Sequence, residues 1–428
     1  MKKIAFKTFG CRVNLYETDA LASIFKQRGY IIEDKLSEAD AIVVNSCTVT
    51  NQSDQKCRQF LHQTKRNNPN ILIVLTGCMV NNRKEELQKS HIADFIIDNE
   101  RKTAIFHILD AYFQGTIIDP EGYDKDLFSY EAAYDTFHTR SLIKIHDGCD
   151  NYCSYCIIPM TRGRATSRNS DDIYRNIRDV IDHGFKEIVL TGVNMGRYNH
   201  QGIGFETLVE NILQIPGDFR LRISSIEPDL FSDHFLDLFN HPKLAPHMHI
   251  CLQSGSDNIL KRMHRHYSAA EFYSMCERIR KVKPTFNITT DIIVGFPGET
   301  EEDFQKTIDM AKEIRFSHIH TFKFSIRNGT LAQKMHDQIP EKIKTTRSSI
   351  IRKISAENKA AYYEMMQGQK QRMLIERIGS DGIARGYGEH YIPIRVINSN
   401  DTRNTFREIT LGEIINKDKD EKAEFIAL

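Results

Sequence analysis

The sequence contains three closely spaced cysteines in the run Cys149-Asp-Asn-Tyr-Cys153-Ser-Tyr-Cys156. Thiols this close together in a chain with few cysteines indicate a metal centre rather than disulfides. Zinc takes four ligands, or three plus water, so a zinc site that recruits His146 is one interpretation. We favour an iron–sulfur cluster, because clusters are held by cysteines and three of them leave one iron of a four-iron cluster open to an outside ligand.

Three other cysteines, Cys11, Cys47 and Cys78, each follow a segment that we predict to be a strand. The ends of neighbouring parallel strands meet at one edge of a sheet, so these thiols are expected to converge. A cysteine at a strand end can also be a small core residue, but three in one domain favour a second cluster with an open iron. The remaining cysteines, Cys57, Cys251 and Cys276, have no such pattern, and we predict ordinary packing roles for them.

The elements that would position these thiols follow from the alternation of apolar runs and amphipathic stretches. Strands are predicted at residues 4–9, 41–44, 71–75 and 93–97, with helices at 14–28, 51–66 and 83–90 between them. This alternation is typical of a parallel sheet covered by helices. A second alternation has strands at 142–145, 187–190, 221–224, 248–252, 287–294 and 319–324, which fits a partial (β/α)6 barrel. The first cysteine run follows the first of these strands, and chemistry in such folds sits at the carboxyl ends of strands.

The rest of the chain reads as connections and a small β domain. Residues 114–139 lack periodicity and are predicted to be a linker, and residues 341–366 an amphipathic helix. From 341 to 377 there are nine Lys and Arg against four Asp and Glu. Alternating runs at 371–376, 392–397 and 408–415, with Gly-rich turns such as 386–388, predict a small antiparallel β-barrel. The expected α/β protein therefore divides into residues 1–113, a linker 114–139, 140–340, a connecting helix 341–366, and 367–428.

Composition excludes several classes of protein. The 428 residues include 58 Lys and Arg against 57 Asp and Glu, a net charge of +1, which excludes a globally basic nucleic-acid binder and an acidic disordered chain. Nine cysteines are too few for a disulfide scaffold of this length. The longest unbroken apolar run, 71–75, is far shorter than the ~18 residues of a membrane-spanning helix. We expect a cytoplasmic protein with no membrane association, in which the thiols stay reduced.

The cysteine run, with Tyr155 before its last cysteine, resembles the radical S-adenosylmethionine superfamily. With both cysteine triplets, the chain is similar over nearly its full length to the methylthiotransferases of that superfamily. The motifs that carry the resemblance are Thr8-Phe-Gly-Cys-Arg-Val-Asn14, Asn45-Ser-Cys-Thr-Val-Thr50, Thr76-Gly-Cys78, Ile157-Ile-Pro-Met-Thr-Arg-Gly-Arg164, Leu252-Gln-Ser-Gly-Ser-Asp257 and Gly295-Phe-Pro-Gly-Glu-Thr300.

The resemblance implies the replacement of a C–H bond by C–S–CH3. It implies two [4Fe-4S] clusters, one held by each triplet, and S-adenosylmethionine as methyl donor and radical source. In the superfamily the open iron of the radical cluster chelates S-adenosylmethionine, and the second cluster is taken to hold the incoming sulfur. A C-terminal TRAM domain that binds RNA is also implied. Partners would be the anticodon stem-loop of a tRNA, a cellular one-electron donor and a sulfur source.

The resemblance also implies residues around S-adenosylmethionine. Gly192 and Asn194 would lie near its amino group, Glu227 and Gln253 near the ribose or the methionine end, and Gly295 near the adenine. Tyr155 belongs to the cluster motif itself. Each polar residue at a strand end has a competing interpretation, since such residues often cap the next helix.

Family branches differ around the first and fourth cysteines. Gly-Cys-Arg-Val-Asn and Thr191-Gly-Val-Asn194 resemble the branch that acts on N6-threonylcarbamoyladenosine at position 37 of tRNA, whereas the isopentenyladenosine branch tends to carry Gly-Cys-Gln-Met-Asn and the ribosomal-protein branch Gly-Cys-Pro-Lys-Asn. We expect methylthiolation at C2 of the first nucleoside, with isopentenyladenosine or a ribosomal-protein aspartate as alternatives. Met160 and His146 depart from the common pattern. The threonylcarbamoyl carboxylate requires a cationic partner that the sequence does not identify.

Three basic segments predict contact with RNA. Arg162, Arg164 and Arg168 lie beside the cysteine run, Lys261, Arg262 and Arg265 form a second group, and the helix 341–366 is the third. Phosphates are bound by several Lys or Arg on one surface. Each segment alone also fits an ordinary solvated face. The sequence alone also allows a second interpretation, in which the protein is a non-catalytic RNA-binding module that holds zinc.

Overall fold

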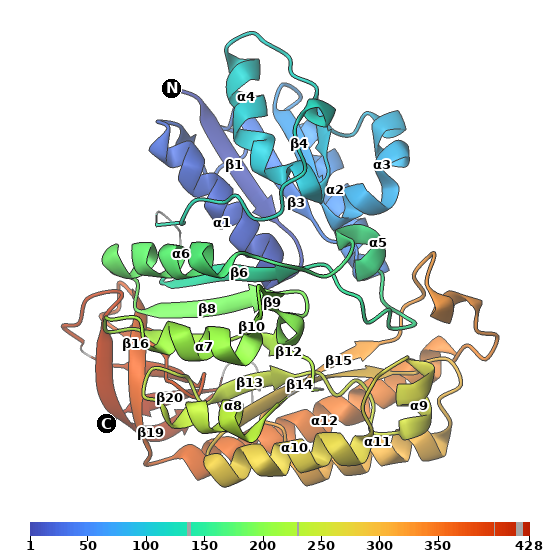
Figure 1. The fold of residues 1–428 in the computed structure, drawn as a ribbon, viewed down its shortest axis with the longest axis vertical. Coiled ribbons are helices and arrows are strands. Elements are labelled where there is room, and N and C mark those ends of the chain that lie inside the picture. Colours follow the sequence, from blue (N-terminus) through green and yellow to red (C-terminus); the bar gives the residue numbers. More distant parts are fainter. Residues whose placement is uncertain (135–137, 229–230, 398, 417–422) are drawn as a thin grey trace.

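The structure is a computed structural model that describes the chain except residues 135–137, 229–230, 398 and 417–422. Three units follow one another: an N-terminal unit from β1 to α4, a central unit from β6 to β15, and a C-terminal barrel from β16 to β20. In Figure 1 the N-terminal unit (blue) lies above the long strands of the central unit, and the C-terminal barrel (red) lies beside the ends at which β6 and β8 begin.

The N-terminal unit is built on a parallel sheet of order β2-β1-β3-β4-β5, as predicted. Its strands are β1 (Lys3–Thr8), β2 (Ile31–Ile32), β3 (Ala41–Ser46), β4 (Leu72–Gly77) and β5 (Phe95–Ile97). The helices are α1 (Arg12–Gln27), α2 (Asn51–Asn67), α3 (Cys78–Ser90) and α4 (Ile105–Phe113), with a 3-10 turn η1 (Asn99–Ala104). Strands β3 and β4 are buried along their whole length, because helices cover both faces of the sheet.

The central unit has two four-stranded sheets, of order β11-β8-β6-β7 and β12-β13-β14-β15. Its six long strands are parallel and match the predicted ones: β6 (Arg140–Asp147), β8 (Glu187–Gly192), β11 (Arg220–Ile223), β13 (His247–Ile250), β14 (Asn287–Val294) and β15 (His318–Lys323). The short strands are β7 (Thr166–Ser167), β9 (Asn199–His200), β10 (Ile203–Gly204) and β12 (Ser225–Ile226). An isolated parallel bridge pairs Leu221 of β11 with Leu244, which precedes β13.

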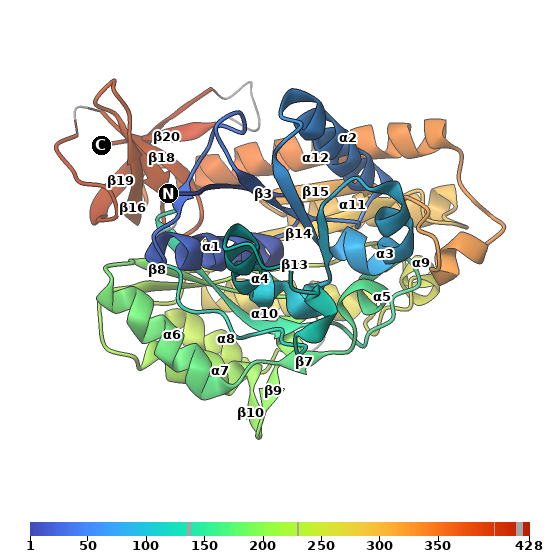
Figure 2. The same ribbon diagram turned by 90° about the horizontal axis from the view of Figure 1, so that it is seen from above.

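Helices line the outside of these sheets. They are α5 (Ile158–Arg162), α6 (Ser170–Asp182), α7 (Phe205–Leu213), α8 (Asp233–Asp237), α9 (Asp257–Arg262), α10 (Ala269–Val282) and α11 (Glu301–Ile314), with 3-10 turns η3 (Met195–Arg197), η4 (Leu238–Asn240) and η5 (Leu331–Lys334). One large apolar core lies between the helices and the strands. Helix α12 (Glu341–Met366), which the sequence predicts, runs along β15 and packs on α11 (Figure 2).

The C-terminal unit is a closed barrel of order β16-β17-β18-β20-β19. Its strands are β16 (Lys370–Ile378), β17 (Ala384–Tyr387), β18 (Pro393–Val396), β19 (Phe406–Ile415) and β20 (Glu424–Ala427). The barrel is not purely antiparallel, because β18 and β20 pair in parallel. The predicted turn at 386–388 is also wrong: Gly386 lies within β17, where an added Cβ would meet the carbonyl oxygen of Leu374 at 1.8 Å. Residues 398 and 417–422 of this predicted domain lie outside the described residues.

The predicted linker 114–139 is mostly irregular where it is described, with one 3-10 turn, η2 (Pro120–Gly122). It is nevertheless held in place, because Tyr130 and Ala133 pack into the core of the N-terminal unit and Ala132 into that of the central unit. Residues 135–137 of this segment are not described. In the described ranges, every helix is too short or too polar to cross a membrane.

Candidate active site

Cys11, Cys47 and Cys78 follow three adjacent strands, β1, β3 and β4. The register pairs Ser46 with Gly77, so β3 and β4 end side by side. Gly10 lies against Cys47, since a Cβ on Gly10 would be 2.7 Å from the Cys47 Sγ atom. The first-domain sheet therefore brings these thiols to one edge, as the sequence predicts.

Two thiols of this first group, those of Cys47 and Cys78, are buried, whereas Cys11 is an exposed residue. Desolvation by the surrounding protein raises the pKa of Cys47 to about 11, and it also raises the pKa of Cys11, an effect that the Arg162 guanidinium opposes. The Asn99 Nδ2 atom lies 3.8 Å from the Cys78 Sγ atom and donates to the carbonyl oxygen of Thr161 at 3.0 Å. Cysteine binds a metal as the thiolate, so a thiol that holds its proton must release it when the metal binds. Binding of iron by this group is therefore expected to release protons.

The second group, Cys149, Cys153 and Cys156, begins two residues after β6. The amide of Cys156 donates to the carbonyl oxygen of Cys153 at 2.9 Å, which folds the run into a tight turn. Two side-chain donors reach its sulfur atoms: Arg265 Nη1 lies 3.3 Å from Cys153 Sγ, and Asn194 Nδ2 lies 3.6 Å from Cys149 Sγ. The backbone amide of Asn151 also donates to Cys149 Sγ at 3.5 Å. Burial raises the pKa of Cys156 to about 12. Hydrogen bonds to sulfur are one means by which proteins tune iron–sulfur clusters.

Asn194 also supplies a test of whether S-adenosylmethionine fits this site. Its Oδ1 atom is buried and has no hydrogen-bond partner within the described part of the chain. A buried acceptor without a donor is unfavourable by about 1–3 kcal/mol, so this atom is suited to a donor from a bound molecule, such as an amino group. Three cysteines and one unsatisfied acceptor at the strand ends fit the predicted cluster with its bound S-adenosylmethionine.

The other residues predicted near S-adenosylmethionine have structural surroundings of their own. Gly192 ends β8, and a Cβ there would meet the His146 carbonyl oxygen at 3.0 Å. Gln253 is buried with a φ of +64°. Gly295 has a φ of +69° and lies against the Lys344 side chain. Tyr155 packs edge-on against Phe296, 6.3 Å between ring centroids. Glu227, the remaining residue predicted near S-adenosylmethionine, forms an ion pair with Arg265. Their contacts with S-adenosylmethionine remain a prediction.

A buried ionic cluster joins the two halves of the site. Glu17 of α1 pairs with three cations, Lys102, Lys144 and Arg162. Asp147 of β6 pairs with two of them, Lys144 and Arg162. The Lys144 Nζ atom is 2.8 Å from Glu17 Oε1 and 2.5 Å from Asp147 Oδ2. Burial disfavours the charged form of Glu17, yet the Arg162 guanidinium and the two ammonium groups hold its pKa well below the usual value. Neither Glu17 nor Asp147 belongs to a recognisable local motif, so the sequence alone did not identify them as members of the site.

The structure corrects part of the predicted RNA surface. Arg162 and Arg168 are buried, at 5% and 4% exposure, and the Arg265 side chain is 3% exposed. All three donate to groups inside the protein, so the prediction that they contact RNA is wrong. Arg164 and Lys261 are exposed, and Arg262 is partly exposed.

One predicted packing thiol has a different setting. Cys57 and Cys276 lie in apolar cores, as expected. Cys251 instead lies in a polar group with His249 and Asp291: the Asp291 carboxylate is 3.1 Å from His249 Nε2 and 4.0 Å from Cys251 Sγ. One ligand atom from each lies close enough to the others to hold a single cation. The alternation of polar residues along β13, His247 and His249, was the only sequence signal for this group.

Two family models match the chain. One, described as "Uncharacterized protein family UPF0004", matches residues 3–98, and that of the radical SAM superfamily matches residues 143–311. The first range contains Cys11, Cys47 and Cys78, and the second contains Cys149, Cys153 and Cys156. The two matches therefore coincide with the two cysteine groups.

Curated relatives are similar over almost the whole chain. The threonylcarbamoyladenosine tRNA methylthiotransferase MtaB of Thermotoga maritima is 36% identical over 401 residues, which cover 92% of this chain and 91% of the relative. The protein of that name from Aquifex aeolicus is 34% identical, covering 87% and 92%. The tRNA-2-methylthio-N(6)-dimethylallyladenosine synthase of Syntrophus aciditrophicus is 33% identical, covering 88% and 84%.

Solved structures share the fold at low identity. The radical S-adenosylmethionine methyltransferase TsrM from Kitasatospora setae superposes with a TM-score of 0.55 at 12% identity, covering 75% of this chain and 73% of that one. The cobalamin-dependent S-adenosylmethionine radical enzyme OxsB has a TM-score of 0.52 at 10% identity, covering 82% and 56%. At these identities the likeness extends to the fold alone.

Proposed function

Because the chain belongs to the radical S-adenosylmethionine methylthiotransferase family and is thus an enzyme of the transferase class, we propose that its substrate is tRNA. It converts N6-threonylcarbamoyladenosine at position 37 to the 2-methylthio derivative by replacing C2–H with C2–S–CH3. Two of the relatives described above bear the name of that activity, which supports this nucleoside over isopentenyladenosine.

Cys149, Cys153 and Cys156 hold one [4Fe-4S] cluster, whose open iron takes S-adenosylmethionine. Cys11, Cys47 and Cys78 hold a second cluster. When bound, these groups supply the radical that removes hydrogen from C2, the sulfur and the methyl group. The chemistry also requires two cellular partners: a one-electron donor and a source of sulfur.

The arrangement of the two cysteine groups is the observation that carries this proposal. Cys156 precedes α5 by two residues, and the carbonyl oxygen of Thr161 in α5 accepts from Asn99, whose amide also reaches Cys78. Arg162, the last residue of α5, lies near Cys11 and Cys78, and its charge acts to lower the pKa of Cys11. A short helix thus connects the two groups, which suits a reaction that uses both on one base.

The chain's own side chains orient and shield this site. Arg265 and Asn194 donate to cysteine sulfurs and so stabilise negative charge on the second group. The ionic cluster around Glu17 is buried where the N-terminal and central units meet.

For the RNA, we propose a surface of Arg164, Lys261, Arg262 and α12, together with the C-terminal barrel acting as a TRAM domain. The barrel and α12 would then correspond to residues 367–428 and 341–366, after domains at 1–113 and 140–340 joined by 114–139. The anticodon stem-loop is the part of the tRNA that carries position 37. The enzyme would act in the cytoplasm, where tRNA is found.

Mass spectrometry of tRNA nucleosides from a strain that lacks this protein tests the proposal. We expect the 2-methylthio derivative of threonylcarbamoyladenosine to disappear and to return when the wild-type protein is supplied, but not when Cys153→Ala is supplied. Loss of the 2-methylthio derivative of isopentenyladenosine instead would assign the other substrate. Zinc in place of iron in the purified protein would favour a non-catalytic RNA-binding module.

A further inference from the structure

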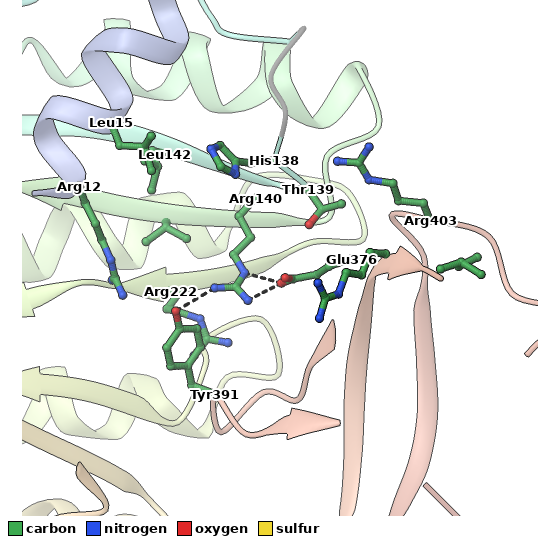
Figure 3. A pocket seen from close by; sticks show the side chains of 13 residues that line it. Arg12, Leu15, His138, Thr139, Arg140, Leu142, Arg222, Glu376, Tyr391 and Arg403 are labelled. Atoms are coloured by element: carbon green, nitrogen blue, oxygen red, sulfur yellow. Dashed lines mark hydrogen bonds and ion pairs between the residues drawn. The ribbon is translucent and has the colours of Figure 1, made fainter. Parts of the chain in front are cut away.

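A cavity of about 670 Å³ opens where α1, the beginning of β6 and β11, and the C-terminal barrel meet (Figure 3). Its walls carry five arginines and one carboxylate: Arg12, Arg140, Arg222, Arg377, Arg403 and Glu376. Ligand sites in proteins commonly have volumes of about 300–1,000 Å³. The excess of positive charge favours an anionic ligand.

Two of these arginines already have carboxylate partners in the protein. Glu187, which is fully buried, pairs with Arg222 at 3.0 Å and with Arg140 at 3.3 Å, and also with Arg220 at 2.7 Å. Glu376 also accepts from Arg140, with Nε 2.6 Å from Oε1 (Figure 3). The guanidinium groups of Arg140 and Arg222 are therefore held in fixed positions by protein carboxylates.

Arg12 differs from them. Its side chain extends from the first turn of α1 into the same space as Tyr391 (Figure 3), with its guanidinium 6.0 Å from the centroid of that ring. Arg12 is partly buried, and no carboxylate among the described residues forms an ion pair with it. A guanidinium that is partly withdrawn from water and lacks an anion is suited to bind one, because a carboxylate accepts two parallel hydrogen bonds from it.

Tyr391 gives this cavity a flat, fixed wall. Its φ of +61° is unusual for a residue with a side chain. The ring stacks on Tyr387 at 5.0 Å, its hydroxyl accepts from Arg140 Nη1 at 3.0 Å, and the Arg222 guanidinium lies 4.6 Å from its centroid. Aromatic rings held in this way are platforms on which RNA-binding proteins stack bases and planar groups. Backbone strain of this kind is concentrated at functional sites.

The cavity also adjoins the proposed reaction centre, because Arg12 directly follows Cys11. In adenine, C2 and the carbon that bears N6 flank the same ring nitrogen. A base that presents C2 to the cysteine groups therefore directs its N6 substituent toward a neighbouring wall of the site. The threonylcarbamoyl substituent ends in a carboxylate, whereas the isopentenyl substituent is uncharged.

Resting on the function proposed above, we infer that the cavity receives the N6 substituent and that Arg12 binds its carboxylate. Arg12 is then a specificity-determining residue: it selects the substrate with a charged substituent over one without. A backbone phosphate of the RNA has similar chemistry and is the other source of an anion for Arg12. The two sources differ in one respect, because phosphates are present in every stem-loop and the carboxylate only in the modified one.

The test measures binding of anaerobically reconstituted enzyme to two anticodon stem-loops by fluorescence anisotropy. One stem-loop carries N6-threonylcarbamoyladenosine at position 37 and the other carries adenosine. The variants are Arg12→Gln, Arg12→Lys and, as a matched control, Arg28→Gln, which removes an exposed arginine next to the other end of α1.

We expect the wild type to bind the modified stem-loop more tightly, and Arg12→Gln to reduce this preference roughly tenfold or more, since charge-assisted hydrogen bonds contribute about 1.5–3 kcal/mol. Affinity for the adenosine stem-loop should stay within about twofold, which also shows that the variant is folded. Arg12→Lys should keep part of the preference, and Arg28→Gln all of it.

Three outcomes would overturn the inference. Equal weakening of both stem-loops by Arg12→Gln would assign Arg12 to a phosphate. A wild-type preference that survives in Arg12→Gln would show that another residue binds the carboxylate, while leaving the proposed function intact. A wild type with no preference for the modified stem-loop would contradict the proposed substrate together with this assignment.

Discussion

Arg162 of α5 and Glu17 of α1 form an ion pair across the boundary between the central and N-terminal units, with Nη1 3.1 Å from Oε1. Both side chains are about 1% exposed. Arg162 also binds Asp147 at 2.8 Å, and its charge acts on Cys11 and Cys78. Its pairing therefore fixes the relative position of the two cysteine groups.

Glu17→Gln is expected to destabilise the protein by about 3–5 kcal/mol, because the variant leaves Lys102, Lys144 and Arg162 buried with a single carboxylate. Urea denaturation at neutral pH measures this change in the free energy of unfolding. Glu302→Gln, which breaks an exposed pair with Lys306, should change it by less than about 1 kcal/mol. Equal effects of the two variants would show that the buried cluster contributes no more to the free energy of unfolding than an exposed ion pair does.

Each cysteine group should hold its own iron. Anaerobic reconstitution of the wild type is expected to give about eight irons per chain. Replacing Cys149, Cys153 and Cys156 by Ala should leave about four irons and abolish cleavage of S-adenosylmethionine, because the cluster that binds it is lost.

Replacing Cys11, Cys47 and Cys78 should also leave about four irons, but cleavage of S-adenosylmethionine should persist while insertion of sulfur stops. Chromatography of 5′-deoxyadenosine and of modified nucleosides separates the two steps. Loss of cleavage in this second variant would contradict the division of roles. Cys276→Ala, which replaces a cysteine of the apolar core that belongs to neither group, is the matched control and should leave the iron content unchanged.

His390 should make stability depend on pH. Burial lowers its pKa to about 3 in the folded protein, where Gln371 and Thr285 hydrogen-bond the neutral ring. The unfolded chain has the ordinary value of about 6.5. The stabilisation is therefore complete above pH 6.5 and is lost as the pH falls toward 3, at about 1.4 kcal/mol per pH unit.

His390→Gln keeps a polar side chain that does not titrate. The difference in unfolding free energy between wild type and this variant, measured in urea at pH 7.5, 5.5 and 4.5, should become less favourable to the wild type as the pH falls. A difference that is the same at all three values would mean that His390 is not held neutral.

Gly386→Ala should disrupt the C-terminal barrel. The added Cβ would meet the backbone carbonyl oxygen of Leu374, which belongs to the paired strand and has no room to move. We expect a loss of about 3 kcal/mol or more and faster proteolysis within the barrel. Gly122→Ala, where an added Cβ meets nothing within 4 Å, should change stability by about 0.5 kcal/mol or less. Similar proteolysis of both variants would contradict the expected clash.

The sequence predicted most elements of the fold because their signals are local. Short apolar runs gave β3 and β4, and the 26-residue α12 was evident from its amphipathic pattern. The strands of the barrel were harder to predict. Gly386 is a residue type that is typical of turns, yet it lies inside β17 because β16 passes close to it, and no local pattern encodes that contact.

By itself the sequence also determined the grouping of Cys11, Cys47 and Cys78, because strand order brings the residues after parallel strands to one edge. Only the tertiary structure decided where the arginines lie. Arg162 and Arg12 are both basic residues next to a cysteine motif, yet one is buried against Glu17 and Asp147 while the other enters a cavity without a carboxylate partner among the described residues. The physical reason is that a charge is neutralised by partners distant in the chain, and those partners are brought near only by folding.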